Sequence, residues 1–179
     1  ARKGDAMKLS AVIAFLAAAA IAPEGQLQEV DLELVLAVDM SRSMNAQEAA
    51  LQRKGYVEAL YDPALARAIE AGPLGRIAVT YVEWAGIGQR RVTIDWQVIE
   101  GGESALAFAK LVEAAPIESA RGTSISGVVD FSVRHIASNS FKGLRTVIDV
   151  SGDGPNNMGR PVLRARADAL EAGLTVNGL

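Results

Sequence analysis

The chain has 179 residues, of which 50% are hydrophobic and 22% are charged, and its formal net charge is −3. This length and composition are typical of one globular domain with a sizeable core, and they exclude an intrinsically disordered chain. The acidic balance and the lack of a Lys/Arg stripe argue against nucleic-acid binding. Because the sequence contains no cysteine, disulfides, thiolate metal sites and a Cys nucleophile are excluded.

The N-terminal residues follow the order of a secretory signal peptide. Basic residues precede an apolar stretch over residues 11–22 that is rich in alanine. We expect residues 1–22 to be a signal peptide that is cleaved near Ala20 or Ala22. A membrane-anchoring helix is the alternative, but this run is shorter than the roughly twenty apolar residues that a span requires. The sequence therefore predicts a secreted or periplasmic protein without stable membrane insertion after cleavage.

The first elements of the mature chain follow a linker predicted over residues 23–30. An apolar run predicts a strand over residues 31–39. Asn45 and Glu48 then have the spacing of a capping box at the start of a helix that runs to about Tyr61. The apolar residues expected on the inner face of this helix are Val57, Leu60 and Tyr61.

Two β-rich runs follow a short second helix. They span residues 76–84 and 91–99, and the six residues between them permit a hairpin but not a parallel crossover. The second run alternates apolar and polar residues, which indicates an edge strand with one wet face. Glu83 and Asp95 are therefore expected to be solvated strand residues rather than catalytic acids.

The second half of the chain alternates helices and strands. Helical patterns begin near Gly102, Gly127 and Pro161, a buried strand is predicted over residues 146–150, and another strand starts near Leu174. This alternation predicts a doubly wound, mostly parallel α/β sheet with one antiparallel edge strand and helices on both faces. A sheet that stops in mid-strand also suggests that the domain over residues 31–179 is incomplete at its C-terminus.

Polar oxygen-bearing side chains stand where the buried strands end. Asp39, Ser41 and Ser43 form a D-x-S-x-S pattern after the first strand, Asp153 follows a later strand, and Thr123 enters a helix from a glycine-bearing loop. The carboxyl ends of such strands share one edge of the sheet. Carboxylate and hydroxyl oxygens suit Mg²⁺, Mn²⁺ or Ca²⁺. The alternative is that the same residue types merely cap helices and turns.

From about residue 31 onward the chain resembles the von Willebrand factor A-type domain. The D-x-S-x-S element, the isolated threonine and the later aspartate look like the metal-ion-dependent adhesion site of that family. The stretches at 81–84, 121–127 and 150–157 look like those of a bacterial secreted subfamily of unassigned function. The resemblance implies a Rossmann-like fold and a non-enzymatic, adhesion-type module in which a divalent cation bridges to an acidic side chain of a partner protein.

Two rival interpretations remain open at this stage. A metal-dependent hydrolase of phosphatase type would use Asp39 as its nucleophile, but Ser41 occupies the position where such enzymes usually carry a second Asp. The only histidine, His135, lies in a helical segment and is expected to be structural or exposed. The other rival is a domain that has kept the fold without metal, because the cation of Arg42 lies beside the predicted site.

Overall fold

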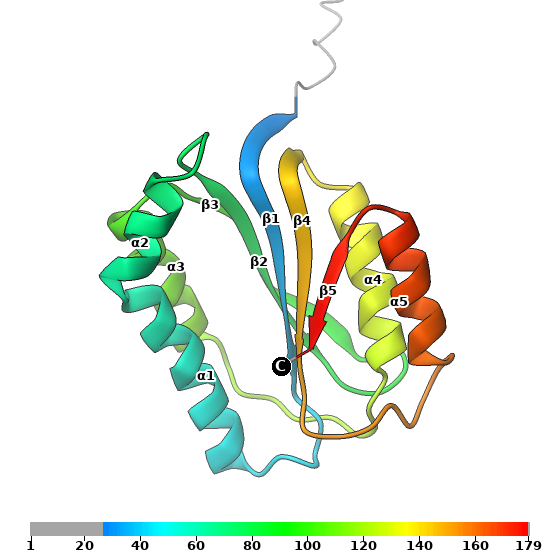
Figure 1. Ribbon diagram of the computed structural model, residues 1–179. Helices are drawn as coiled ribbons and strands as arrows, with labels where there is room; N and C mark the ends of the chain where they lie inside the picture. Colours follow the sequence, from blue (N-terminus) through cyan, green and yellow to red (C-terminus); the bar gives the residue numbers. More distant parts are fainter. Residues whose placement is uncertain (1–26, 179) are drawn as a thin grey trace, which may run out of the picture.

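The computed structural model describes residues 27–178, so the predicted signal peptide lies outside the described residues. Five strands form one sheet in the order β3-β2-β1-β4-β5. The strands β2, β4 and β5 continue the sheet in parallel on the two sides of β1, whereas β3 pairs antiparallel with β2 at one edge. Figure 1 shows the sheet between two layers of helices. The strands are β1 Gln28–Asp39, β2 Ile77–Trp84, β3 Arg90–Ile99, β4 Phe141–Ser151 and β5 Thr175–Gly178.

The sheet is doubly wound because its central strand is apolar on both faces. In β1, Leu36 and Val38 contribute to one core cluster, whereas Val35 and Ala37 contribute to the other. The predicted mostly parallel sheet with an antiparallel edge strand is therefore confirmed. Three helices lie on the first face and two on the second: α1 Ala46–Tyr61, α2 Pro63–Glu70 and α3 Gly102–Ala114, and then α4 Ile125–Ala137 and α5 Val162–Glu171.

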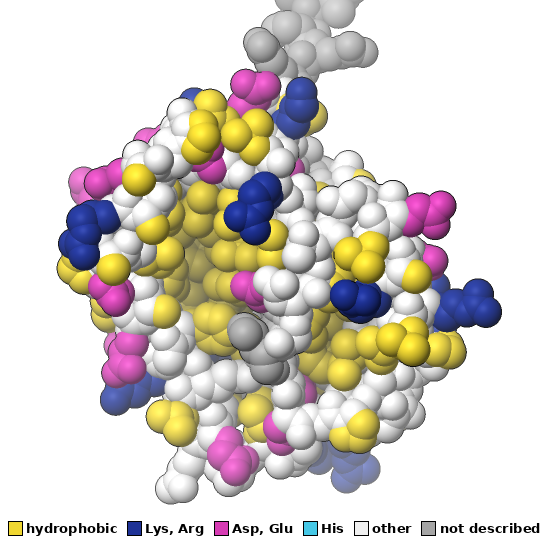
Figure 2. Space-filling model, viewed as in Figure 1, with side chains coloured by type: hydrophobic (Ala, Val, Ile, Leu, Met, Phe, Trp, Pro, Cys, Tyr) yellow, Lys and Arg dark blue, Asp and Glu magenta, His cyan; other side chains and the backbone are white. Residues whose placement is uncertain are grey.

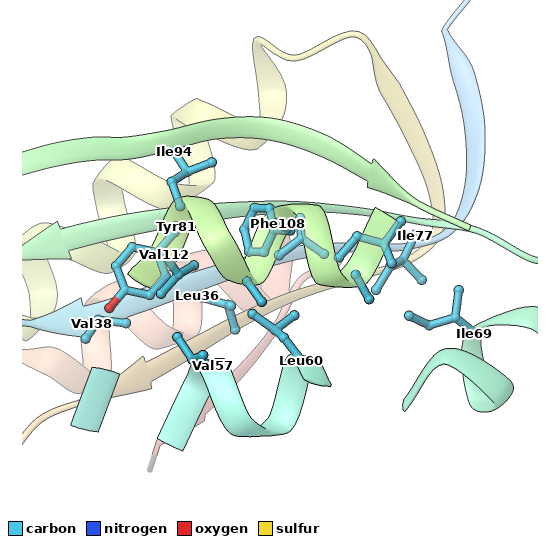
Figure 3. Close-up of a cluster of buried hydrophobic side chains, with 14 residues drawn as sticks. Leu36, Val38, Val57, Leu60, Ile69, Ile77, Tyr81, Ile94, Phe108 and Val112 are labelled. Carbon is cyan, nitrogen blue, oxygen red and sulfur yellow. The ribbon is translucent and has the colours of Figure 1, made fainter. Parts of the chain in front are cut away.

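The core under the first helical layer is built by α1 and α3 against β1 and β2. Figure 3 shows Val57 and Leu60 of α1 pointing toward Phe108 of α3. The prediction for Tyr61 was wrong, because 41% of this residue is exposed. Tyr61 is the last residue of α1, one position beyond the buried Leu60, and its hydroxyl donates to Glu113 Oε2 at 3.3 Å outside the core.

The sequence predicts that the first strand begins at residue 31, but in the structure it begins at Gln28. The reason is a tertiary pairing, since Gln28 aligns with Phe141 and Val30 with Gly143 in the neighbouring strand β4. At the other end of the same strand, the predicted capping box of α1 is confirmed. The side chain of Asn45 accepts from the amide of Glu48, and Glu48 Oε2 accepts from the amide of Asn45. These two hydrogen bonds fix the start of α1 directly after Asn45.

Part of the first core borders solvent. Figure 2 shows hydrophobic side chains gathered in a hollow between the helices at the left and the central strands. The partly buried Leu32, Leu34 and Tyr56 pack against this core cluster. None of the helices within residues 27–178 has the length and apolar character that a membrane crossing requires.

Candidate metal centre at the carboxyl edge of the sheet

Three segments that are distant in the sequence meet where the parallel strands end. The residues after β1 pair with the loop before α4, since Arg42 N donates to Ala120 O at 2.8 Å and Ala120 N donates to Met40 O at 3.0 Å. The loop after β4 reaches the same place, where Asn157 N donates to Thr123 O at 3.0 Å. The topology predicts this meeting, because the carboxyl ends of parallel strands lie at one edge.

A chain of short hydrogen bonds joins four of the five predicted site residues. The amide of Ser41 donates to Asp39 Oδ1 at 2.6 Å. The hydroxyl oxygens of Ser41 and Ser43 are 2.6 Å apart, and Ser43 Oγ donates to Asp153 Oδ1 at 2.8 Å. The first loop and the later aspartate are therefore in direct contact, although 110 residues separate Ser43 from Asp153.

Thr123, the fifth predicted residue, lies beside the same loop. Its side chain is buried, with 5% of the residue exposed. A Cβ atom added to Gly154, the residue after Asp153, would stand 3.9 Å from Thr123 Oγ1. The threonine hydroxyl thus borders the loop that carries Asp153, and the structure brings all five predicted residues to one place.

Asp39 is the buried acid of this group, with 2% of the residue exposed. Its Oδ1 atom accepts from Ser41, but the buried Oδ2 atom has no hydrogen-bond partner within the described residues. Burial raises the pKa of this carboxyl above its ordinary value, the hydrogen bonds from Ser41 oppose that rise, and the charge of Asp153 adds to it. An ionised carboxylate in this position has no ion-pair partner in the described part of the chain, which is costly in a buried site.

The chemistry of the five side chains fits a hard divalent cation. They offer two carboxylates and three hydroxyls, all of them oxygen donors. Across residues 27–178 no three His, Cys, Asp or Glu side chains gather closely enough to hold a metal ion. A cation at this edge would therefore depend on the hydroxyls of Ser41, Ser43 and Thr123 as well as on the acids.

Two asparagines of the loop after β4 position the loop before α4, and the sequence analysis gave them no such role. Asn157 Oδ1 accepts from the amide of Thr123 at 2.9 Å, and Asn156 Oδ1 accepts from the amide of Ser126 at 3.2 Å. The side chain of Ser124, the N-cap residue of α4, makes no capping hydrogen bond. The side-chain oxygen of Asn156, from another loop, accepts the hydrogen bond at this helix start instead. The sequence has these two asparagines side by side, but nothing in the sequence indicates which residues they contact.

The family model described as a protein of unknown function (DUF1194) matches residues 29–179. The chain belongs to this family. Comparison with curated protein sequences found no match.

Solved structures with the same fold include a thread matrix protein and a pilus adhesin. Proximal thread matrix protein 1 from the mussel byssus has a TM-score of 0.60 and 16% identity over 85% of this chain and 38% of its own. The pilus adhesin SpaC from Lactobacillus rhamnosus GG has a TM-score of 0.62 and 14% identity over 86% of this chain and 25% of its own. BatB from Bacteroides thetaiotaomicron has a TM-score of 0.56 and 19% identity, with coverages of 82% and 65%.

At these identities the likeness concerns the fold alone, and it confirms the expected Rossmann-like, mostly parallel architecture. The chain covers less than two thirds of each of these longer chains. A further structure of the byssus protein, with a TM-score of 0.61 and 15% identity, is described as having a zinc-occupied MIDAS motif.

A second buried acid of this family member, Glu83, was wrongly expected to be solvated. Only 3% of Glu83 is exposed. It accepts from Arg53 Nη2 at 2.5 Å, from Arg91 Nη2 at 2.5 Å and from Thr93 Oγ1 at 2.9 Å. Alternation along β2 does not reveal these contacts, because one arginine comes from α1 and the other from β3. Asp95 is exposed, as predicted.

Arg53 also ties α1 to the segment that precedes the site. Its guanidinium donates to the carbonyl oxygen of Ala115 and, at 3.2 Å, to that of Pro116. These two residues begin the loop whose Ala120 pairs with the residues after β1. Through Arg53, the buried Glu83 thus helps to anchor the loop that pairs with the residues after β1.

His135 lies in the last turn of α4, whereas Thr123 precedes the first turn of that helix. Its ring stacks on Trp96, at 5.4 Å between centroids, and on Phe131, at 5.6 Å. Burial lowers its pKa. These contacts give His135 a packing role between α4 and β3, in agreement with the sequence analysis.

Proposed function

We propose that this chain is a divalent-cation-dependent protein-binding module of adhesion type. In this proposal Asp39, Ser41, Ser43, Thr123 and Asp153 hold a Mg²⁺ ion, or Mn²⁺ or Ca²⁺ in its place, and the cation bridges to an acidic group on a partner protein. The observation that carries the proposal is the buried Oδ2 atom of Asp39, which has no hydrogen-bond partner within residues 27–178 although it stands beside a hydrogen-bonded chain of oxygen donors.

The composition of the donor set favours binding of an acidic partner. Mg²⁺ prefers near-octahedral oxygen ligation and retains water readily. Three of the five donors are neutral hydroxyls, so with the carboxylates acting partly through water the cation would stay electron-poor and attractive to one more anionic oxygen. The neighbours named as a pilus adhesin and a thread matrix protein, and the neighbour described with a zinc-occupied motif, support an adhesive and metal-dependent role.

Export is part of the same proposal. It rests on the basic and then apolar order of residues 1–22. A module that binds partners at a cell surface or in the periplasm would carry such a leader.

The alternative of a phosphatase-like hydrolase requires Asp39 to attack a substrate. One of its oxygens is engaged by Ser41, and only 2% of the residue is exposed. A nucleophile must come within hydrogen-bond reach of the reacting atom, and this burial makes Asp39 a poor one. The geometry therefore favours binding over hydrolysis.

The proposal is tested by calorimetric titration of the full-length chain with Mg²⁺ and Mn²⁺. We expect Asp39→Ala and Asp153→Ala to weaken cation binding by at least about 100-fold, since each removes an anionic oxygen donor. Asp95→Ala, which removes an exposed acid from β3, is the matched control and should leave the affinity unchanged. Equal binding by all four proteins would refute the site.

A phosphatase and esterase panel separates binding from catalysis. The binding role predicts no turnover above the level of Asp39→Asn. Metal-dependent turnover that disappears in Asp39→Asn would establish the hydrolase instead.

A further inference from the structure

A small cavity lies directly beside the candidate metal centre. It has a volume of about 140 Å³ and lies between the end of β1, the first turns of α1 and residues 117–119. Its wall includes Ser41, one of the proposed cation ligands. The cavity therefore adjoins the proposed cation site through Ser41. Its apolar wall is formed by Met40, Met44, Ala46, Ala49 and Ile117.

Two of the polar side chains in the wall of this cavity, Asn45 and Glu118, already have partners. The side chain of Asn45 accepts from the amides of Gln47 and Glu48, at 2.9 and 3.0 Å. The carboxylate of Glu118 pairs with Arg91 Nη1 at 2.7 Å. A ligand group that enters the cavity thus meets mainly apolar surface, where a polar group would lose its hydrogen bonds to water without replacement.

The size of the cavity limits its occupant to one side chain. An apolar cavity of about 150 Å³ is large enough to hold benzene, so about 140 Å³ accommodates one aliphatic side chain. Two of the wall residues are methionines, whose unbranched chains adapt to the shape of a guest. Ile117 is 49% exposed, so the wall opens toward an approaching partner.

Charge near the cavity favours an acidic segment. Arg42 stands between Ser41 and Ser43 in the sequence, and its side chain is exposed. It carries a positive charge next in the chain to two of the proposed ligands, and such a charge attracts an anionic partner over a range of about one Debye length. A purely aliphatic partner would gain nothing from this charge.

We infer that the partner binds through an acidic residue with an aliphatic side chain next to it, the carboxylate going to the cation and the aliphatic group to this cavity. Neighbouring Cα atoms in a peptide are about 3.8 Å apart, so a cavity that shares Ser41 with the cation site is within reach of the adjoining residue. This inference rests on the proposed function, and it adds the sequence class of the partner: an acidic residue flanked by leucine, isoleucine or valine.

The test uses two blocked peptides as probes, Gly-Leu-Asp-Leu-Gly and Gly-Gly-Asp-Gly-Gly, titrated into the full-length chain with saturating Mg²⁺ and followed by NMR. We expect the leucine peptide to bind at least about tenfold more tightly, because burial of one aliphatic side chain has that effect or a larger one. Ala49→Trp, which fills the cavity, should reduce this ratio to about one. The matched control is Ala50→Trp on the exposed side of α1, which should keep the ratio.

A second pair of variants covers the case in which the tryptophan disturbs α1. Ile117→Ser should lower the ratio severalfold, whereas Ile87→Ser, another exposed isoleucine, should not change it. Mg²⁺ affinity is measured for every variant and should stay at the wild-type value. If the wild-type chain does not bind Mg²⁺, the proposed function is refuted. Normal cation binding with equal affinity for the two peptides, or a ratio that Ala49→Trp leaves intact, would refute the aliphatic cavity alone.

Discussion

Two buried carboxylates on adjacent strands differ in the source of their countercharge. Asp39 ends β1 and Glu83 lies near the end of β2, where the register pairs Asp39 with Trp84 and Glu83 with Val38. Glu83 receives two guanidinium groups and a hydroxyl from its own chain. Asp39 receives one amide from Ser41, and its second oxygen has no partner among the described residues.

The difference separates a structural acid, Glu83, from the acid that we propose to bind a cation, Asp39. A buried charge needs a paired charge, and breaking such a pair costs several kcal/mol. The protein supplies that pair to Glu83, so the role of Glu83 is complete within the fold. Among residues 27–178 no such pair reaches Asp39 at the edge where three segments meet, and a cation that binds there, as we propose, would stabilise the folded chain.

The largest effect is expected when the internal pair is broken. Glu83→Ala leaves the buried Arg53 and the partly buried Arg91 without their shared acceptor, and we expect a loss of about 3–5 kcal/mol in the free energy of unfolding. Urea unfolding measures this loss, and Asp95→Ala should stay within about 0.5 kcal/mol of wild type. A loss below about 1 kcal/mol for Glu83→Ala would remove the contrast between the two acids.

The next effect concerns the positioning of the candidate ligands. Asn157→Ala removes the acceptor of the Thr123 amide, and we expect Mg²⁺ affinity to fall about tenfold, as is usual when a partner of a metal ligand is lost. Asn157→Asp keeps an oxygen acceptor for the Thr123 amide and should retain most of the wild-type Mg²⁺ affinity. Calorimetry measures both variants, and an unchanged affinity in Asn157→Ala would show that the threonine is held by its other contacts.

A smaller effect of opposite sign is expected for Asp39 in the absence of metal. Burial raises the pKa of this carboxyl in the folded chain above 3.8, its ordinary value. The folded state then binds more protons than the unfolded state, so the stability of the metal-free chain falls as pH rises from 3.8 through the raised pKa. Asp39→Asn avoids this loss and should have a Tm a few degrees above that of wild type at neutral pH with a chelator present.

Addition of Mg²⁺ should reverse that order, because the cation compensates Asp39 and has no equivalent effect on Asp39→Asn. Thermal unfolding at several pH values, with chelator and with Mg²⁺, measures both differences. A wild type that is more stable than Asp39→Asn without metal at neutral pH would mean that Asp39 is already compensated within the chain.

The smallest effect is expected from Arg42, which is exposed beside the site. Arg42→Ala should raise Mg²⁺ affinity about two- to threefold at low salt, because a nearby cation repels the metal ion. The increase should vanish near 1 M salt, where the Debye length is about 3 Å. Arg67→Ala, an exposed arginine of α2, serves as the control, and a fall in affinity in Arg42→Ala would show that this side chain assists the site.

Local patterns in the sequence were sufficient for most of the fold. Buried runs in β1 and β4 and the short connection before β3 indicated a mostly parallel sheet with an antiparallel edge, and Asn45 with Glu48 located the start of α1. Such features depend on neighbouring residues, on periodicity and on capping, all of which can be recognised in the amino-acid sequence. The gathering of Asp39, Ser41, Ser43, Thr123 and Asp153 also followed from strand direction alone.

The tertiary structure decided which polar groups have a partner. The solvated role expected for Glu83 was wrong because Arg53 and Arg91 reach it from α1 and β3, and the asparagines after Asp153 acquired a role only when their loop met Thr123. The unpartnered oxygen of Asp39 and the apolar cavity beside Ser41 likewise arise where distant segments meet. Periodicity specifies the face on which a side chain lies, but the countercharge or neighbour that it meets there depends on packing between separate elements.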